Sequence, residues 1–304
     1  MGVGTRSRSD VAVCYMEDKV DKKLLDSIKR RIQAIRVEAL TMNIESLAEC
    51  LYEHKWINPF PKFKYSERPD TAAAAVLDGN IVIMVDNSPA VMIIPASIFD
   101  IIEEADDFNF SPMIGSYLRI TRFFFSIITW ILTPLWLLFV NNPEWVPEFM
   151  KFILITDDIT VPVLLQLLIL ELAVDGLKLA AVNTPTMLST PLSIVAGIVV
   201  GEYAVSSGWF NPEALLYMAV VTVGTYGQTN FEMGYAFKFL RVLMLILTQI
   251  FNLGGFIAGV VISVLMIAFN RTITGKSYIY PLIPWDGKML KRKVFRVRLP
   301  HGYK

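Results

Sequence analysis

The charge pattern of this chain changes abruptly near Arg122 and Phe123. Residues 1–110 carry 18 acidic and 13 basic side chains among short apolar runs. Four later stretches contain no Asp, Glu, Lys or Arg, namely residues 123–143, 179–201, 214–231 and 242–270. Each is close to or above the roughly 18–20 apolar residues that cross a hydrocarbon core. The sequence therefore predicts a water-soluble domain followed by an integral membrane domain.

Three regions follow from this pattern. We expect an α+β cytoplasmic domain over residues 1–110, an all-α integral membrane domain over residues 111–270, and a basic cytoplasmic tail over residues 271–304. The membrane domain is predicted to hold about four to six transmembrane helices, and counting the apolar stretches along the sequence gives six crossings. The tail carries nine Lys or Arg and one acid. Because positive flanks stay in the cytoplasm, both termini are expected there.

Apolar spacing in residues 1–110 predicts a small sheet with helices packed on it. Leu and Ile recur at helical intervals in residues 21–35, and residues 10–16 alternate as a strand does. A hairpin is predicted from residues 81–85 and 91–94, joined through Asp86-Asn87-Ser88-Pro89, a favourable turn sequence. The remaining predicted elements are helices at residues 44–53, 70–77 and 98–105 and an extended segment through residues 59–65.

One face of a predicted membrane helix is charged. Glu171, Asp175 and Lys178 stand at i, i+4 and i+7 within residues 161–181. An ionisable group at bilayer depth costs about 2.5–3.5 kcal/mol on insertion scales, so it normally faces protein or water. These residues are therefore candidates for a pore or an intramembrane polar site. The alternative is an interfacial helix whose polar face lies among the lipid headgroups.

Glu202 is a second intramembrane candidate. It lies within the apolar residues 192–206, where a carboxylate in contact with lipid would be costly. We expect it to face the protein interior or a pore. Glu232, Lys238 and Arg241 are the charged residues that could pair with it or lie at an interface.

Two pairs of glycines four residues apart predict close helix packing. They are Gly197 with Gly201 and Gly255 with Gly259, each inside an apolar run. Small residues at this spacing let helix backbones approach closely. The stretch 235–269 is long enough for two spans or a hairpin, and residues 252–255 are its natural break.

The sequence offers little for catalysis. Glu67, Arg68, Pro69 and Asp70 form a charged segment that predicts a salt-bridged turn, a carboxylate pair or an N-cap by Asp70. There is no nucleophile beside a base and no glycine-rich phosphate loop. The cysteines Cys14 and Cys50 and the histidines His54 and His301 have no ligand-like spacing. We expect no enzyme activity, no cofactor, no metal site and no bound nucleic acid.

Several blocks resemble a known family. Residues 66–70 followed by residues 72–94 are similar to a block of the spore germination proteins of the GerA A-subunit and stage V sporulation protein AF family. Residues 185–208, with Gly201-Glu202-Tyr203, resemble the Pro-rich membrane segment of that family. Further similar blocks are residues 212–217, 223–226 and 278–284. Family members carry another N-terminal soluble subdomain, which we expect this chain to lack.

The resemblance implies a multi-pass protein of the spore inner membrane. It implies an oligomeric, germinant-receptor-like ion channel complex that promotes release of ions or small molecules during germination. The expected partners are the lipid bilayer, further copies of the chain and other germination membrane subunits. The alternatives are a non-conducting membrane scaffold and a secondary transporter, although no repeat relates residues 123–181 to residues 192–269.

Overall fold

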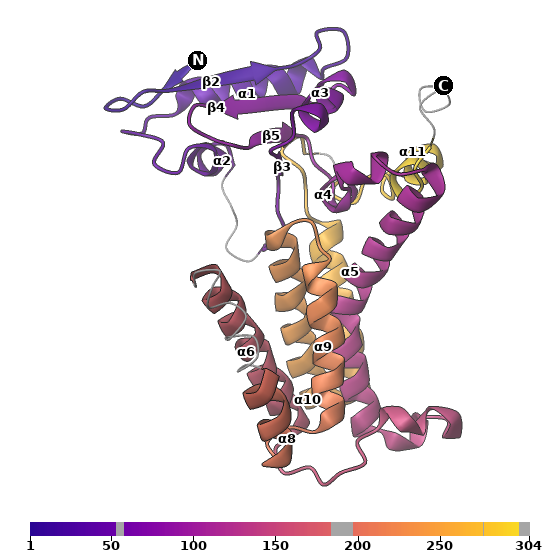
Figure 1. Ribbon diagram of the computed structural model, residues 1–304. Coiled ribbons are helices and arrows are strands. Elements are labelled where there is room, and N and C mark those ends of the chain that lie inside the picture. The colour runs from indigo at the N-terminus through magenta and orange to yellow at the C-terminus, as the bar shows by residue number, and fades with distance from the viewer. Residues whose placement is uncertain (53–57, 184–196, 276, 298–304) are drawn as a thin grey trace. The chain divides into compact units, whose positions relative to one another are not determined.

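The computed structural model describes residues 1–52, 58–183, 197–275 and 277–297 (Figure 1). The chain divides into two compact units. Unit 1 comprises Met1–Ile120 together with Leu265–Lys304, and unit 2 comprises Thr121–Val264. The stretch that we expected as a separate tail therefore groups with the N-terminal region. Its last seven residues, like His54, lie outside the described residues.

Unit 1 is built on one antiparallel sheet with the strand order β1-β2-β4-β5-β3. The predicted hairpin is confirmed, because β4 and β5 pair with Ile81 opposite Ile94. Asn87 in the connecting turn has a φ of 60°, a left-handed conformation that asparagine tolerates. The strands are β1 (Gly2–Val3), β2 (Ser9–Cys14), β3 (Lys64–Ser66), β4 (Ile81–Val85) and β5 (Val91–Ile94).

The two faces of the sheet are covered differently. The helices α1 (Lys22–Ala34) and α2 (Ile44–Leu51) bury their apolar faces with strand residues such as Ile83 in one cluster. A smaller cluster of Ala72, Val82 and Ile93 joins α3 (Pro69–Leu77) to the strands. Because side chains alternate along a strand, Val82 and Ile83 belong to opposite faces. The further helices of unit 1 are α4 (Ile98–Ile102), η1 (Ala105–Phe108) and α11 (Gly287–Val294).

Helices account for most of unit 2, and two of them begin or end in unit 1. They are α5 (Pro112–Asn141), α6 (Val163–Asn183), the π-helical segment η4 (Gly197–Tyr203), α8 (Ala204–Ser206), α9 (Pro212–Tyr226) and α10 (Phe231–Ala268). Two short 3-10 helices, η2 (Pro143–Trp145) and η3 (Glu148–Ile153), lie between α5 and α6.

Asn252 interrupts α10, with a φ of 51° and a ψ of −129°. A Cβ at Gly255 would lie 1.8 Å from the Leu247 carbonyl oxygen, and one at Gly259 would lie 2.6 Å from Met244 Cγ. The two arms of α10 therefore run back along each other and leave room only for glycine. The predicted break at residues 252–255 is confirmed.

The expected four to six transmembrane helices are not confirmed. Two described helices are long and apolar enough to cross a bilayer, because each contains an 18-residue stretch of high mean hydropathy, 2.1 in α5 and 2.3 in α10. The 21 residues of α6 include three ionisable side chains, and α9 has only 15 residues. The predicted span at residues 192–206 lies partly outside the described residues.

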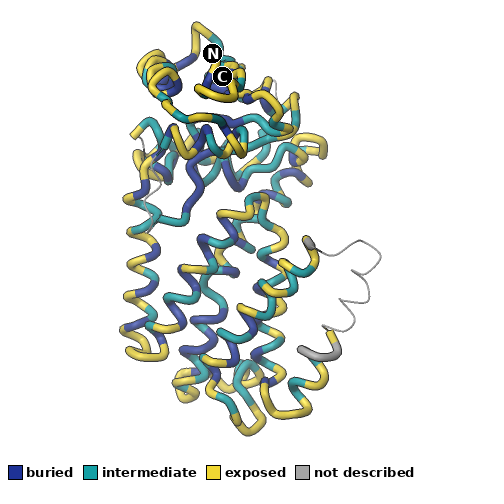
Figure 2. The backbone as a smooth tube through the Cα atoms, turned by 90° about the vertical axis from the view of Figure 1, so that its left-hand side faces the viewer, coloured by how far each residue is buried: buried dark blue, intermediate teal, exposed yellow. Residues whose placement is uncertain are grey.

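Unit 2 exposes apolar side chains and buries polar ones along the same helix. On α6, Leu172 is 73% exposed and Val182 is 84% exposed, whereas the neighbouring Glu171 is 4% exposed. Figure 2 shows buried and exposed positions following one another along the helices. In water this arrangement would be unfavourable, since apolar surface gains by leaving water. It is the distribution expected of helices surrounded by lipid.

Candidate functional site

The centre of unit 2 holds a buried ion pair between Glu171 of α6 and Arg241 of α10. Arg241 Nε donates to Glu171 Oε1 at 2.5 Å, and its Nη2 donates to Oε2 at 2.8 Å. Only 4% of Glu171 and 3% of Arg241 is exposed. A bidentate guanidinium–carboxylate pair is among the strongest polar contacts in proteins. It fixes α6 and α10 in one mutual register.

A second pair lies one helical turn away. Lys238 Nζ forms an ion pair with Asp175, and it donates to the Glu171 backbone oxygen at 3.0 Å. It also lies 3.5 Å from Glu171 Oε2. Two acids from α6 and two bases from α10 therefore alternate in one network, because i, i+4 and i, i+3 neighbours share a helix face.

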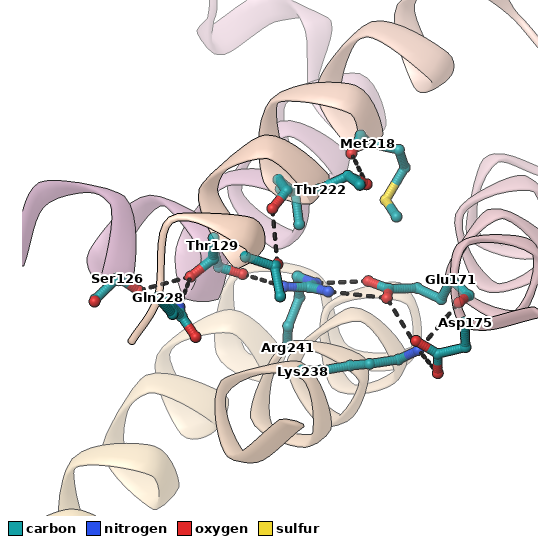
Figure 3. A network of polar contacts seen from close by, with 11 residues as sticks. Ser126, Thr129, Glu171, Asp175, Met218, Thr222, Gln228, Lys238 and Arg241 are labelled. Atoms are coloured by element: carbon teal, nitrogen blue, oxygen red, sulfur yellow. Dashed lines mark hydrogen bonds and ion pairs between the residues drawn. The ribbon is translucent and has the colours of Figure 1, made fainter. Parts of the chain in front are cut away.

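The network extends to α5 and to the turn between α9 and α10 (Figure 3). Arg241 Nη1 donates to the Thr129 backbone oxygen. Gln228 Nε2 donates to Thr129 Oγ1 at 3.0 Å, and that hydroxyl donates to the Ser126 carbonyl at 3.0 Å. Contacts from α5, α6, α10 and the turn at Gln228 thus meet around one guanidinium.

The sequence pattern predicted the acidic residues of this network correctly but assigned its basic residues to the wrong partner. Glu171 and Asp175 were singled out, and they do share a face. Lys238 and Arg241 were considered as partners of Glu202, but the structure pairs them with Glu171 and Asp175. Lys238 and Arg241 are three residues apart on an apolar helix and so share one face, as the acids do at a spacing of four. That shared face was the available signal.

A cavity of about 60 Å³ adjoins the network, and all five ionisable residues of this region line it. Lys178 Nζ lies 5.3 Å from the ring centre of Tyr226 and 5.7 Å from that of Tyr235. Asp175 and Gln228 also line the cavity, and each has one fully buried oxygen, Oδ1 and Oε1 respectively, without a hydrogen-bond partner among the described residues.

The other intramembrane candidates lie apart from the network. Glu202 is exposed on η4 and belongs to none of the ion pairs found in the described part of the chain. Gly197 and Gly201 are also on η4, and a Cβ at either would meet nothing described within 4 Å. Gly224 was not singled out, although a Cβ there would lie 2.6 Å from Thr129 Cγ2, so α9 and α5 approach closely.

The charged segment of unit 1 is a salt-bridged turn, as one of the three interpretations predicted. Arg68 donates to both oxygens of Asp70, at 3.1 and 2.7 Å, and also to Asp106. These hydrogen bonds lower the pKa of Asp70 to about 2. The N-cap of α3 is Arg68 with Pro69 in the first turn, so the N-cap interpretation of Asp70 was wrong. Glu67 is exposed.

Unit 1 contains a second ion cluster, which the sequence pattern did not reveal. Lys293 of α11 lies 2.5 Å from Asp100 Oδ1 and 3.0 Å from Glu103 Oε2. Arg119 lies 2.6 Å from Glu103 Oε1 and 3.2 Å from Asp107 Oδ2. Residues separated by almost 200 positions meet here, so no local spacing predicts the cluster.

The charge balance of this cluster sets two pKa values. Burial alone would lower the pKa of Lys293, but the nearby Asp100 and Glu103 carboxylates raise it above its ordinary value. Burial alone would raise the pKa of Asp100, but the charge of Lys293 and hydrogen bonds from Lys293 and Ser97 hold it below its ordinary value. Among the described residues, no group of three or more His, Cys, Asp or Glu is placed to hold a metal ion.

Comparison with known proteins places the whole chain in one family. Residues 1–304 match the family model described as Bacillus/Clostridium GerA spore germination protein. Stage V sporulation protein AF of Bacillus subtilis (strain 168) is 35% identical over 298 residues, covering 98% of this chain and 60% of that protein. Spore germination protein GerLA of Bacillus cereus is 26% identical over 298 residues, covering 97% of this chain and 60% of that protein.

A third relative is named as a membrane protein. The uncharacterized membrane protein YfkQ of Bacillus subtilis (strain 168) is 26% identical over 267 residues, covering 86% of this chain and 52% of that protein. The chain thus spans about half to three fifths of the length of these relatives. No solved structure matches the chain. The family match over its whole length shows that this chain belongs to the GerA family of spore germination proteins.

Proposed function

We propose that this chain is a subunit of an oligomeric complex in the spore inner membrane that promotes release of ions or small molecules during germination. Family membership supports the link to germination. Two long apolar helices and the lipid-type exposure of α6 support the membrane location. The assembly, the conducting role and the cytoplasmic placement of both termini belong to the proposal.

The observation that carries the proposal is the buried Glu171–Arg241 pair with its satellites Asp175 and Lys238. Such charges are costly inside helices that expose apolar side chains to lipid, and they usually mark an ion or solute path. A purely structural contact between helices needs no more than small residues and dispersion, as the glycines of α10 illustrate.

Glu202, Gly197 and Gly201 support the oligomeric part of the proposal. All three lie on η4, where Glu202 is exposed and a Cβ at either glycine would meet no described atom within 4 Å. A second copy of the chain, or another germination membrane subunit, would cover the glycines and move Glu202 out of contact with lipid.

Flux through proteoliposomes tests the conducting role. We expect the full chain to release trapped Rb⁺ faster than protein-free vesicles do, and Glu171→Gln and Glu202→Gln to change that rate or its ion selectivity. Glu148→Gln is the matched control, since Glu148 is exposed on η3 and pairs only with Lys151 in the described part of the chain.

The mass of the assembly gives the second half of the test. A strict monomer in detergent, without flux after correct insertion, would contradict the proposal and favour a non-conducting scaffold. An oligomer whose flux is unaffected by both substitutions would remove these carboxylates from the path.

A further inference from the structure

Lys178 is held differently from the other two bases of the cavity. Arg241 and Lys238 each contact a carboxylate within 4 Å, whereas Lys178 forms no ion pair with any described residue. Its ammonium instead lies against the rings of Tyr226 and Tyr235, at 5.3 and 5.7 Å from their centres. Two aromatic faces around one ammonium form the kind of site that binds a cation through the ring quadrupoles.

The same cavity wall offers oxygen atoms that the protein leaves unused. Asp175 Oδ1 and Gln228 Oε1 are fully buried and have no donor among the described residues. Buried oxygens are nearly always satisfied by a protein group, water or an ion. Both residues line the cavity that Lys178, Tyr226 and Tyr235 also line.

The charges of the wall balance only without Lys178. The cavity is lined by three bases, Lys178, Lys238 and Arg241, and by two acids, Glu171 and Asp175. With Lys178 withdrawn, the two remaining bases neutralise the two acids. The site could then hold one positive charge in place of the ammonium, and the cavity beside Lys178 already has a volume of about 60 Å³. That is room for about two waters or one dehydrated monovalent ion.

We infer that Tyr226, Tyr235, Asp175 and Gln228 form a binding site for a monovalent metal cation, and that Lys178 occupies this site as a tethered competitor. The lysine stem has four flexible carbons, so the ammonium can leave without moving α6. An incoming K⁺ or Rb⁺ would enter the cavity beside the two rings, where Asp175 and Gln228 also line the wall.

This site deepens the proposed function but is testable without it. If the complex conducts, exchange of Lys178 for a free cation would open the path beside the Glu171–Arg241 pair. That step rests on the proposed function. Cation binding in the absence of Lys178 depends only on the cavity.

Thermal unfolding of the full chain in detergent measures the binding. KCl is titrated against N-methylglucamine chloride at constant ionic strength. We expect Lys178→Met to gain a saturable, K⁺-dependent rise in Tm of about 3–5 °C at tenfold excess over Kd. The original chain and Lys178→Arg, which keep the tethered charge, should need far more K⁺ for the same rise.

Two controls define the site. Adding Asp175→Asn to Lys178→Met should abolish the K⁺ response, whereas Lys151→Met, on the exposed η3, should behave as the original chain does. An equal K⁺ response in the original chain and in Lys178→Met, or a response unaffected by Asp175→Asn, would overturn the inference.

A second measurement covers the case in which Lys178→Met does not fold. Acylation of the original chain, read residue by residue by mass spectrometry, should label Lys178 faster at high K⁺ than at high N-methylglucamine. Unchanged labelling would contradict the competition between Lys178 and K⁺. K⁺ binding by Lys178→Met without any flux would support the site and contradict the proposed function. Flux without K⁺ binding would support the proposed function and contradict the site.

Discussion

The two units place their charges in opposite environments. In unit 2, Glu171 and Arg241 are enclosed by helices whose outer side chains are apolar. In unit 1, Lys293, Asp100 and Glu103 line cavities of about 330 and 840 Å³ beside the sheet domain. Both clusters contain well-formed ion pairs, so contact geometry alone does not distinguish them.

The difference lies in what replaces a lost partner. Water can enter the unit 1 cavities and solvate an orphaned charge, which limits the cost of a substitution. In the interior of unit 2 an orphaned charge has little access to water, and its full desolvation penalty remains. The same kind of salt bridge is therefore expected to have very different weight in the two units.

The largest effect is expected from Arg241→Met. The substitution leaves Glu171 buried without its bidentate partner, and breaking a buried pair on one side costs about 3–5 kcal/mol. Thermal unfolding in detergent, with loss of unit 2 helicity as the signal, would show the change as the largest drop in Tm of the variants considered.

The double variant Glu171→Met/Arg241→Met is the control for this prediction. Replacing both partners by apolar groups of similar size is often neutral, so the double variant should be more stable than either single one. If the loss of stability in the double variant equals the sum of the losses in the two single variants, the Glu171–Arg241 pair is solvated. The contrast between the two units would then be wrong.

Gly255→Leu should have the next largest effect, because unit 2 depends on close backbone approach as well as on charge. The new side chain would collide with the Leu247 carbonyl, where a Cβ would lie at 1.8 Å, and overpacking costs about 1–3 kcal/mol. Its matched control is Gly254→Leu, one residue away, where a Cβ meets nothing described within 4 Å. Equal Tm losses for both variants would show that helix propensity, not the hairpin contact, decides.

Lys293→Gln tests the unit 1 cluster through its pH dependence. In the original chain the lowered pKa of Asp100 contributes stability above its ordinary pKa of 3.8, and this is lost as pH falls through the folded value. Without Lys293, burial of Asp100 would raise that pKa and reverse the sign. We expect a cost of about 1–2 kcal/mol at neutral pH that shrinks on acidification below about pH 4.

Unfolding monitored by circular dichroism from pH 3 to pH 7 would measure this difference. Lys288→Gln, in the first turn of the same helix, is the matched control, since Lys288 has no ion pair among the described residues. A gap between Lys293→Gln and the original chain that stays constant with pH would show that the charge of Lys293 is not what stabilises the cluster.

The contrast also explains which parts of the molecule could be predicted from sequence. Local periodicity identified the β4–β5 hairpin, α1 and the break in α10, because each is determined by neighbours in the chain. It identified the Glu171–Asp175 face for the same reason. The partner assignment of Arg241 failed, since pairing across helices depends on which faces meet, and both Glu171 and Glu202 were compatible with the sequence.

Long-range contacts set the limit more generally. The Lys293 cluster joins α11 to α4 across almost 200 residues, and the basic composition of that stretch predicted only a cytoplasmic tail. Gly224 stands alone in its helix, so no spacing marked its contact with Thr129. Such sites follow from packing, which single-sequence periodicity does not encode.

The smallest effect is expected from Arg68→Gln, which probes an exposed ion pair rather than an enclosed one. Arg68 is 37% and Asp70 is 64% exposed at the side chain. Exposed pairs contribute little because water and salt compensate for them. The substitution should therefore lower Tm less than any variant above, while the pKa of Asp70, now about 2, rises toward 3.8. Since a lowered carboxylate pKa stabilises the fold only above the folded value, any loss of stability should disappear on acidification through that range.

NMR titration of Asp70 measures the pKa and a melting curve measures the stability. A Tm loss as large as that of Arg241→Met would mean that enclosure by apolar helices is not what gives the Glu171 pair its weight.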